Sequence, residues 1–97
     1  MAAPEPVLVA GCWRPAATVA TYRVTDPSTG DDRGRVWPVS GWADVDAALA
    51  AAAVAARELA ALPSERLAEF LERYAARLEA RTDTLVAEAH ADTGLAV

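Results

Sequence analysis

Cys12 and His90 are the residues of this 97-residue chain whose types most readily suggest catalysis or metal binding. Cys12 follows a glycine in a short turn and has no histidine or other base near it in the sequence, which favours a structural thiol over a nucleophile. His90 falls in the last turn of an expected helix, where it should meet the negative helix end; a ligand or acid–base role is the alternative. One cysteine and one histidine cannot form a disulfide, and they cannot complete a zinc site without carboxylates or a second chain.

Several other kinds of active site are excluded because the residues that they need are missing. The chain has no lysine, so it lacks the amine of a Walker A loop, of a Schiff-base nucleophile and of a lysine base. It also has no glycine-rich loop that could hold phosphates. We therefore expect no catalytic, cofactor-binding or metal-ligating residue in this chain.

Two further groups of residues could be taken for a site. Acids and arginines recur at spacings of three or four in one segment, a pattern typical of a solvent-exposed, ion-paired helix face rather than of paired catalytic carboxylates. They are Glu65, Glu69, Glu72 and Glu79 with Arg66, Arg73 and Arg77. We expect the three tryptophans, Trp13, Trp37 and Trp42, to share a packing cluster rather than to form a platform that stacks on a ligand.

The charge and hydropathy of the chain argue against nucleic acid and membranes as partners. Nine arginines against 14 acids give a net charge of −5 without a basic cluster, whereas nucleic-acid binding needs a positive surface. The alanine-rich run at 47–56 is too short and too weakly hydrophobic to span a bilayer. Residues 9–12 match a bacterial lipoprotein box, but no basic segment or long apolar stretch of a signal peptide precedes them. With a single thiol, we expect a soluble, cytoplasmic protein.

The chain is long enough for one small domain, but its core is expected to be thin. Alanine accounts for 25 residues, whereas Val, Leu and Phe together account for only 20. That share of large apolar residues is close to the level below which a sequence cannot bury enough surface to fold.

Before Ser40 the pattern predicts strands and turns. A hairpin is expected at Val7–Val9 and Cys12–Arg14, because the Ala10-Gly11 pair between them can supply a two-residue turn. Two further strands are expected at 21–25 and 35–39, joined through the Asp-Pro-Ser-Thr-Gly turn at 26–30. The proline at position 38 restricts the second of these strands to an edge or an end.

After Ser40 the pattern predicts helices. Apolar residues recur at helical spacing over 43–61, with a face of small residues that allows a partner to approach closely. A second helix follows with Pro63 at its first position and an apolar stripe that consists of Leu67, Phe70, Leu71, Tyr74 and Leu78. A third helix is expected at about 84–91, capped by Thr82 or Asp83 and ended by Gly94 in the left-handed conformation. The fold class is therefore an α+β segment.

The order and spacing of these pieces are more specific than any one of them. They are Gly11-Cys12-Trp13, the turn at 26–30, Asp-Val-Asp-Ala-Ala-Leu at 44–49, Leu-Pro-Ser-Glu-Arg at 62–66, Leu-Glu-Ala-Arg at 78–81 and Ala-Asp-Thr-Gly at 91–94. From about Val7 to Gly94 the chain resembles the N-terminus of the aldehyde dehydrogenase superfamily. It departs from the family at Asp26, where Asn is usual, and at residues 31–34, which lengthen the hairpin tip. Residues 90–95 look more like the branch that acts on α-ketoglutaric semialdehyde and fatty aldehydes.

The resemblance implies that residues 1–97 form the N-terminal part of the coenzyme-binding and oligomerisation region, with strands at about 7–39 and helices at about 43–92 of the α/β aldehyde dehydrogenase fold. It implies NAD or NADP as the coenzyme of the full-length enzyme, and the rest of the chain or other subunits as partners. The family's catalytic cysteine, glutamate base and coenzyme loop lie in later segments. The catalytic domain is therefore expected to be absent from this chain, which alone should be inactive.

Some members of the family also hold a cation through backbone carbonyls. These would map to Val24 and Thr25, with the carboxylate partner expected beyond Val97. Two other functions stay open from the sequence. The chain could be a stand-alone helical interaction module, whose apolar stripes close on each other, or the remnant of a decayed gene.

Overall fold

The computed structural model describes residues 2–97 and contains two small antiparallel sheets followed by three helices. The elements are β1 (Val7–Val9), β2 (Cys12–Arg14), β3 (Thr18–Thr25), β4 (Asp32–Ser40), α1 (Trp42–Ala60), α2 (Ser64–Ala80) and α3 (Thr82–Thr93). The predicted α+β fold class is confirmed, and strands give way to helices at Gly41, close to the predicted boundary.

The β1–β2 hairpin has the register that the sequence predicts, with Val9 opposite Cys12. Its turn residues, Ala10 and Gly11, have φ values of 53° and 78°. Two successive positive φ values are the signature of a type I′ turn, whose twist suits an antiparallel pair of strands. The glycine takes this conformation without strain, whereas Ala10 does not have that freedom.

Strands β3 and β4 are longer than predicted: β3 begins at Thr18, before the alternating residues, and β4 begins at Asp32, in the lengthened tip. Tyr22 pairs with Trp37 and Thr25 pairs with Asp32, with irregular register at two points. Pro38 lies opposite Thr21 within this sheet of two strands, so both strands are edges, as the proline requires. The backbone N–H of Glu5 bonds the Val36 carbonyl at 2.8 Å, which ties the N-terminal segment to β4.

The predicted helices are present, but the details of two helix starts were wrong. Pro63 is the residue that precedes α2, with an extended ψ of 147°, rather than the first residue of the helix. Helix α3 begins at Thr82, not at position 84, and no side chain caps it. The reason is that the Thr82 hydroxyl points back to α2 and donates to the Glu79 carbonyl at 2.8 Å. Gly94 ends α3 with φ 70°, as predicted.

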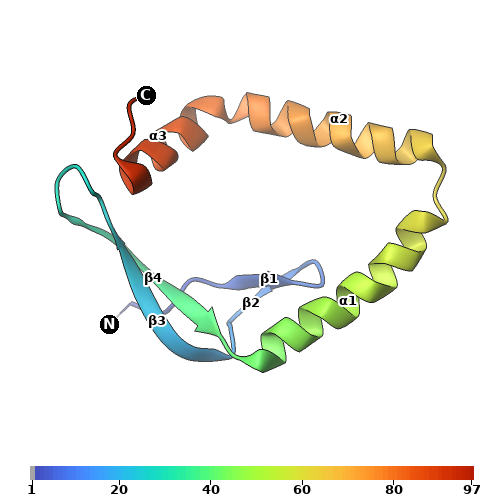
Figure 1. Cartoon of the computed structure of the whole chain (residues 1–97), viewed down its shortest axis with the longest axis horizontal. Helices are drawn as coiled ribbons and strands as arrows, with labels where there is room; N and C mark the ends of the chain where they lie inside the picture. Colours follow the sequence, from blue (N-terminus) through green and yellow to red (C-terminus); the bar gives the residue numbers. More distant parts are fainter. Residues whose placement is uncertain (1) are drawn as a thin grey trace.

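The elements follow one another around an open frame (Figure 1). The β3–β4 hairpin leads into α1, α2 runs back, and α3 returns to the tip of the hairpin, while β1 and β2 lie within the frame. The molecule measures 49 × 34 × 16 Å, and its radius of gyration is 17.3 Å. A compact domain of this length has a radius near 13 Å, so the frame is thin and does not close around a core.

Few side chains are buried in the part of the chain that the structure describes. Val36 is the buried apolar residue and Asp44 the buried charged one. The apolar stripe of α2 is exposed along its length, and Phe70 and Tyr74 stack on each other with ring centroids 6.2 Å apart. The predicted tryptophan cluster was wrong: Trp13 and Trp42 are 69% and 74% exposed, and Trp37 lines a separate cavity.

The small-residue face of α1 is used as the sequence predicts. Ala48, Ala51, Ala52 and Ala55 line a groove together with the β1–β2 turn. Alanine allows this close approach because its side chain ends at Cβ. The hairpin is thereby held against the first half of α1.

Candidate functional site

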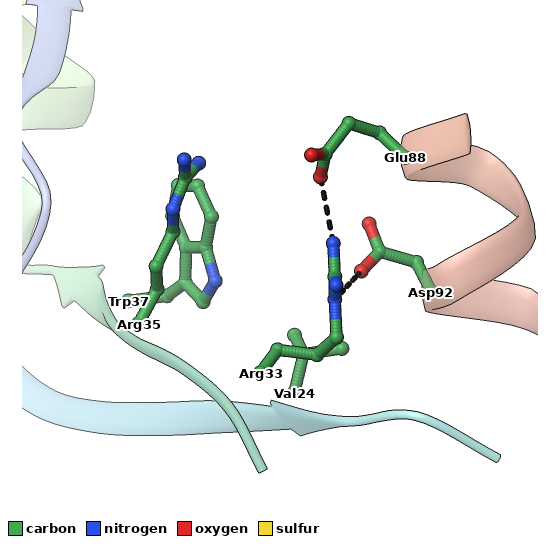
Figure 2. Close-up of a pocket in the computed structure, with 6 residues that line it drawn as sticks. All are labelled: Val24, Arg33, Arg35, Trp37, Glu88 and Asp92. Atoms are coloured by element: carbon green, nitrogen blue, oxygen red, sulfur yellow. Dashed lines mark hydrogen bonds and ion pairs between the residues drawn. The ribbon is translucent and has the colours of Figure 1, made fainter. Parts of the chain in front are cut away.

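A cavity of about 170 Å³ lies where the tip of the β3–β4 hairpin meets α3. Six residues from three elements line it: Val24, Arg33, Arg35, Trp37, Glu88 and Asp92. Figure 2 shows Arg33 reaching from β4 toward the two acids of α3, while Arg35 lies apart from them. We refer to this place as the tip–α3 junction.

Arg33 is the residue that joins the two sides of the junction. Its Nη2 donates to Glu88 Oε2 at 2.7 Å, and its Nε donates to Asp92 Oδ1 at 3.1 Å. The Arg33 side chain is only 28% exposed, although both acids are about half exposed. Hydrogen bonds between ionised partners are the strong ones in proteins, and a guanidinium can make several at once.

A second contact closes the frame beside this junction. A Cβ built on Gly94 would lie 3.0 Å from Ser28 Oγ and 3.1 Å from Pro27 Cγ, so the end of α3 passes directly against the turn between β3 and β4. Asp26 shapes that turn through its carboxylate, which accepts from the Ser28 N–H at 2.8 Å. The turn at 26–30 and the end of α3 at 91–94 are therefore in contact.

Asp44 forms a separate polar centre at the start of α1. Its Oδ2 accepts from the Ala17 N–H at 2.8 Å, and its Oδ1 pairs with Arg14 Nη1 at 2.9 Å. Burial, the largest single influence, raises the pKa of Asp44, but the hydrogen bonds from Ala17, Ser40 and Arg14 outweigh it and hold the pKa below the ordinary value of 3.8. Both oxygens of the Asp44 carboxylate therefore bond other parts of the chain, and the side chain links elements rather than binding a substrate.

An exposed ion pair joins Arg23 of β3 to Asp32 of β4. The hydrogen bond from Arg23 lowers the pKa of Asp32, and the Gly34 N–H adds to that effect. The same bond raises the pKa of Arg23. Because both side chains are about half exposed, the pair is screened by solvent and contributes little to stability.

The residues first considered for chemistry are not brought together. Cys12 is exposed on β2. The Nδ1 atom of His90 lies within hydrogen-bond distance of the Leu95 carbonyl, beyond the end of α3. On α2, Glu69 pairs with Arg66 and Arg73 at 3.9 and 2.7 Å, as the ion-paired interpretation of this face predicts.

Four residues of these two polar centres were not identified as site residues from the sequence: Arg33, Glu88, Asp92 and Asp44. A signal was present for the acids of α3, because two carboxylates four residues apart at a helix C-terminus repel each other and the helix dipole. Such a pair is stabilised by a nearby cation, but nothing in the sequence identified which one. Asp44 was interpreted only as a favourable charge in the first turn of a helix.

The cation that the sequence resemblance implies does not fit the tip–α3 junction. Val24 does line the cavity, together with the carboxylates of Glu88 and Asp92. Both carboxylates, however, already bind Arg33. Across residues 2–97, no three His, Cys, Asp or Glu side chains gather as metal ligands.

A dinucleotide does not fit the described residues either. A pyrophosphate binds helix N-termini through free N–H groups and the positive end of the helix dipole. Each of the three helices instead carries a carboxylate in its first turn, namely Asp44, Glu65 and Asp83. These charges would repel a phosphate at each position. No helix within residues 2–97 is long and apolar enough to cross a membrane.

Comparison with models of known protein families gives one match, which covers residues 13–97 and is described as the aldehyde dehydrogenase family. The matched range begins in β2 and includes every later element. No solved structure matches the chain significantly.

Proposed function

The chain belongs to the aldehyde dehydrogenase family, and we propose that it forms the N-terminal part of the coenzyme-binding and oligomerisation region of an NAD(P)-dependent enzyme that oxidises aldehydes to carboxylates. In this proposal residues 2–97 build a frame, and the cysteine thioester chemistry takes place on later segments of the enzyme. The branch that acts on α-ketoglutaric semialdehyde and fatty aldehydes is the proposed subfamily, because residues 90–95 resemble it most.

The observation that supports this proposal best is the exposed apolar face of α2. Leu67, Phe70, Leu71, Tyr74 and Leu78 are between 38% and 62% exposed, although they form one stripe at helical spacing. Contiguous apolar patches of this kind mark surfaces that another protein segment covers. A groove that Leu59 and Leu62 line together with α2 extends the same surface toward α1.

The partners that we propose for this surface are the remaining segments of the dehydrogenase chain or its other subunits. The molecule is only 16 Å thick in its shortest dimension, and the open frame leaves the apolar face of α2 uncovered. NAD or NADP would then bind those other segments, since the helix N-termini of this chain carry acids.

The two alternatives, a stand-alone interaction module and a decayed remnant, predict different structures. A stand-alone interaction module should close the stripes of α1 and α2 on each other, whereas Leu49 and Phe70 are 59% and 62% exposed. This exposure favours the enzyme segment over the module. A decayed remnant is compatible with the same structure and is separated from the enzyme segment only by experiment.

We also propose the cytoplasm as the compartment. The exposed thiol of Cys12 is compatible with a reducing environment, in which an unpaired cysteine is not oxidised to a disulfide. This assignment rests on one residue and on the family, and fractionation of cells with an antibody against the chain tests it.

The experiment that tests the main proposal is to determine the coding sequence contiguous with this segment and to assay the complete gene product with a panel of aldehydes and either coenzyme. We expect roughly 400 further residues, because a dinucleotide-binding domain and a catalytic domain each need on the order of 150–250 residues. Aldehyde-dependent reduction of NAD or NADP is expected from that product. A gene product that consists of this segment alone and melts sharply, independently of concentration, would instead support the interaction module.

A further inference from the structure

The two acids of α3 at the tip–α3 junction repel each other, and one arginine lies between them. Glu88 and Asp92 are four positions apart and therefore share a face of the helix, close to its C-terminus at Thr93. Like charges at this spacing destabilise a helix, and the negative end of the helix dipole adds to the repulsion. A positive charge between the two carboxylates relieves this repulsion.

Arg33 supplies that charge from the other side of the frame. It is 55 residues before Glu88 and 59 before Asp92 in the sequence, and it bonds both through different guanidinium nitrogens. The guanidinium is the least exposed of the three charged groups. An isolated surface ion pair contributes little to stability. Here one ordered arginine bonds two carboxylates at once, so the three side chains form a network.

The other arginine of the cavity does not share this role. Arg35 lines the same cavity but pairs with Glu5, at 4.0 Å, and its side chain is 60% exposed. It therefore provides a matched comparison for Arg33 within one cavity.

We propose that the Arg33 guanidinium takes the place of a bound metal ion at the tip–α3 junction. Its positive charge holds Glu88 and Asp92 of α3 beside Val24, so that no metal ion is needed there. The lengthened hairpin tip, Asp31 to Gly34, is what carries this cation to α3. Gly34 takes a φ of 82° directly after Arg33, within β4, where the pairing with β3 changes register between Arg23 and Thr25. If Arg33 is replaced by an uncharged residue, the two carboxylates become available to an external cation that prefers oxygen ligands.

Terbium ion is a suitable probe, because it prefers oxygen ligands and its luminescence can be sensitised by the indole of Trp37, which lines the same cavity. The complete gene product is titrated as wild type, Arg33→Met, Arg35→Met and the double variant Arg33→Met/Asp92→Asn. We expect saturable luminescence several-fold above wild type in Arg33→Met only, and its loss when Asp92 is also replaced or when Trp37→Phe is added. Equal luminescence in wild type and Arg33→Met, or an equal gain in Arg35→Met, would overturn the proposal.

A second measurement uses the melting temperature in sodium chloride and in choline chloride at equal ionic strength. Wild type and Arg33→Lys should respond to the two salts alike, whereas Arg33→Met should be stabilised more by sodium. If Arg33→Met does not fold in choline chloride, recovery of its circular dichroism in sodium chloride supports the proposal. Failure in both salts, or an equal response to both, would show that an external cation cannot replace Arg33 and would overturn it.

Discussion

At the scale of single residues, Asp44 connects parts of the chain that are far apart in the sequence. Its carboxylate bonds Ala17, which lies between β2 and β3, and pairs with Arg14 at the end of β2. The Ala17 carbonyl in turn accepts from the Gly41 N–H at 2.6 Å, next to the start of α1. The first turn of α1 is therefore anchored to the strands through Asp44, which is only 4% exposed.

The lowered pKa of Asp44 predicts how acid affects the fold. Because the pKa in the folded state lies below the ordinary 3.8, the unfolded state binds a proton more readily, and stability rises with pH through this range. The contribution of Asp44 is fully present above pH 3.8 and is lost as the pH falls through the lower, folded-state pKa. Unfolding of the complete gene product by urea at a series of pH values should show this loss in wild type and a flatter profile in Asp44→Asn.

The control for this prediction is Asp46→Asn, two positions along the same helix at an exposed site. It should leave the acid profile unchanged. A profile equally flat in both variants would mean that the general charge of the helix, rather than the bonds of Asp44, sets the acid response. The remaining acid dependence belongs in part to Asp32, whose pKa is also lowered.

Gly94 predicts a difference between two glycines of similar conformation. Gly94 and Gly30 have φ values of 70° and 79°, so alanine at either costs about 1–2 kcal/mol for the left-handed conformation. A Cβ at Gly30 meets nothing within 4 Å, whereas one at Gly94 meets Pro27 and Ser28 at about 3 Å. Gly94→Ala should therefore be less stable than Gly30→Ala by a further 1–3 kcal/mol or so, the usual cost of overpacking. Chemical denaturation of both variants of the complete gene product measures it, and equal losses would contradict the contact.

These residues show what a sequence does and does not predict at this scale. The spacing of Thr93-Gly94 after a helical pattern identifies a helix C-terminus, because the signal is local. The contact of Gly94 with Pro27 depends on how three helices carry the chain back to the hairpin. Likewise, Arg33 could be recognised as a charged tip residue, but its partners are more than 50 positions away.

At the scale of elements, periodicity predicts the helices better than it predicts their ends. The stripe of α2 follows from apolar residues at spacings of three and four. The start of α3 at Thr82 was predicted two residues late, since the Thr82 hydroxyl can serve as a cap or bond back to Glu79, and the sequence does not decide between them. Strands β3 and β4 were each predicted three residues too short at the start. The first residues of β4, Asp32 to Gly34, are polar or glycine and carry no alternating pattern.

The exposed stripe of α2 predicts different effects of one substitution in two settings. Phe70 is 62% exposed in the structure, so replacing it in this segment alone should change stability by no more than about 0.5 kcal/mol. If other segments of the enzyme cover the stripe, Phe70→Ala in the complete gene product should cost about 3–5 kcal/mol, as for a buried phenylalanine. Thermal or chemical unfolding of the complete product measures the difference.

Glu72→Ala is the matched control for this prediction, since Glu72 lies two positions from Phe70 and on another face of α2. It should have a small effect in both settings. A small effect of Phe70→Ala in the complete gene product would mean that the stripe is not covered, and it would count against the proposed partners.

At the scale of the whole molecule, the open frame predicts that residues 1–97 are marginally stable by themselves. Val36 is the buried apolar residue among residues 2–97, and the radius of gyration of 17.3 Å exceeds that of a compact domain of this length. Folding must offset the loss of chain entropy by burying apolar surface, and little is buried here. The isolated segment should show helical far-UV circular dichroism with a weak near-UV spectrum. A sharp melt above about 60 °C, near the top of the usual range for domains, would contradict this.

The same frame predicts that the isolated segment does not bind the coenzyme. A pyrophosphate needs free N–H groups at a positive helix end, and the first turns of α1, α2 and α3 carry Asp44, Glu65 and Asp83 instead. The arginines of the tip–α3 junction are not available as a substitute, because Arg33 binds two carboxylates and Arg35 faces Glu5. Calorimetry with NAD and NADP should detect no saturable heat at micromolar coenzyme. The variant Glu65→Gln/Asp83→Asn tests whether the acids alone prevent binding. We expect no binding by this variant either, because the chain also lacks a glycine-rich loop. Saturable binding by the wild-type segment would place the coenzyme on this frame and contradict the proposal that later segments of the enzyme bind it.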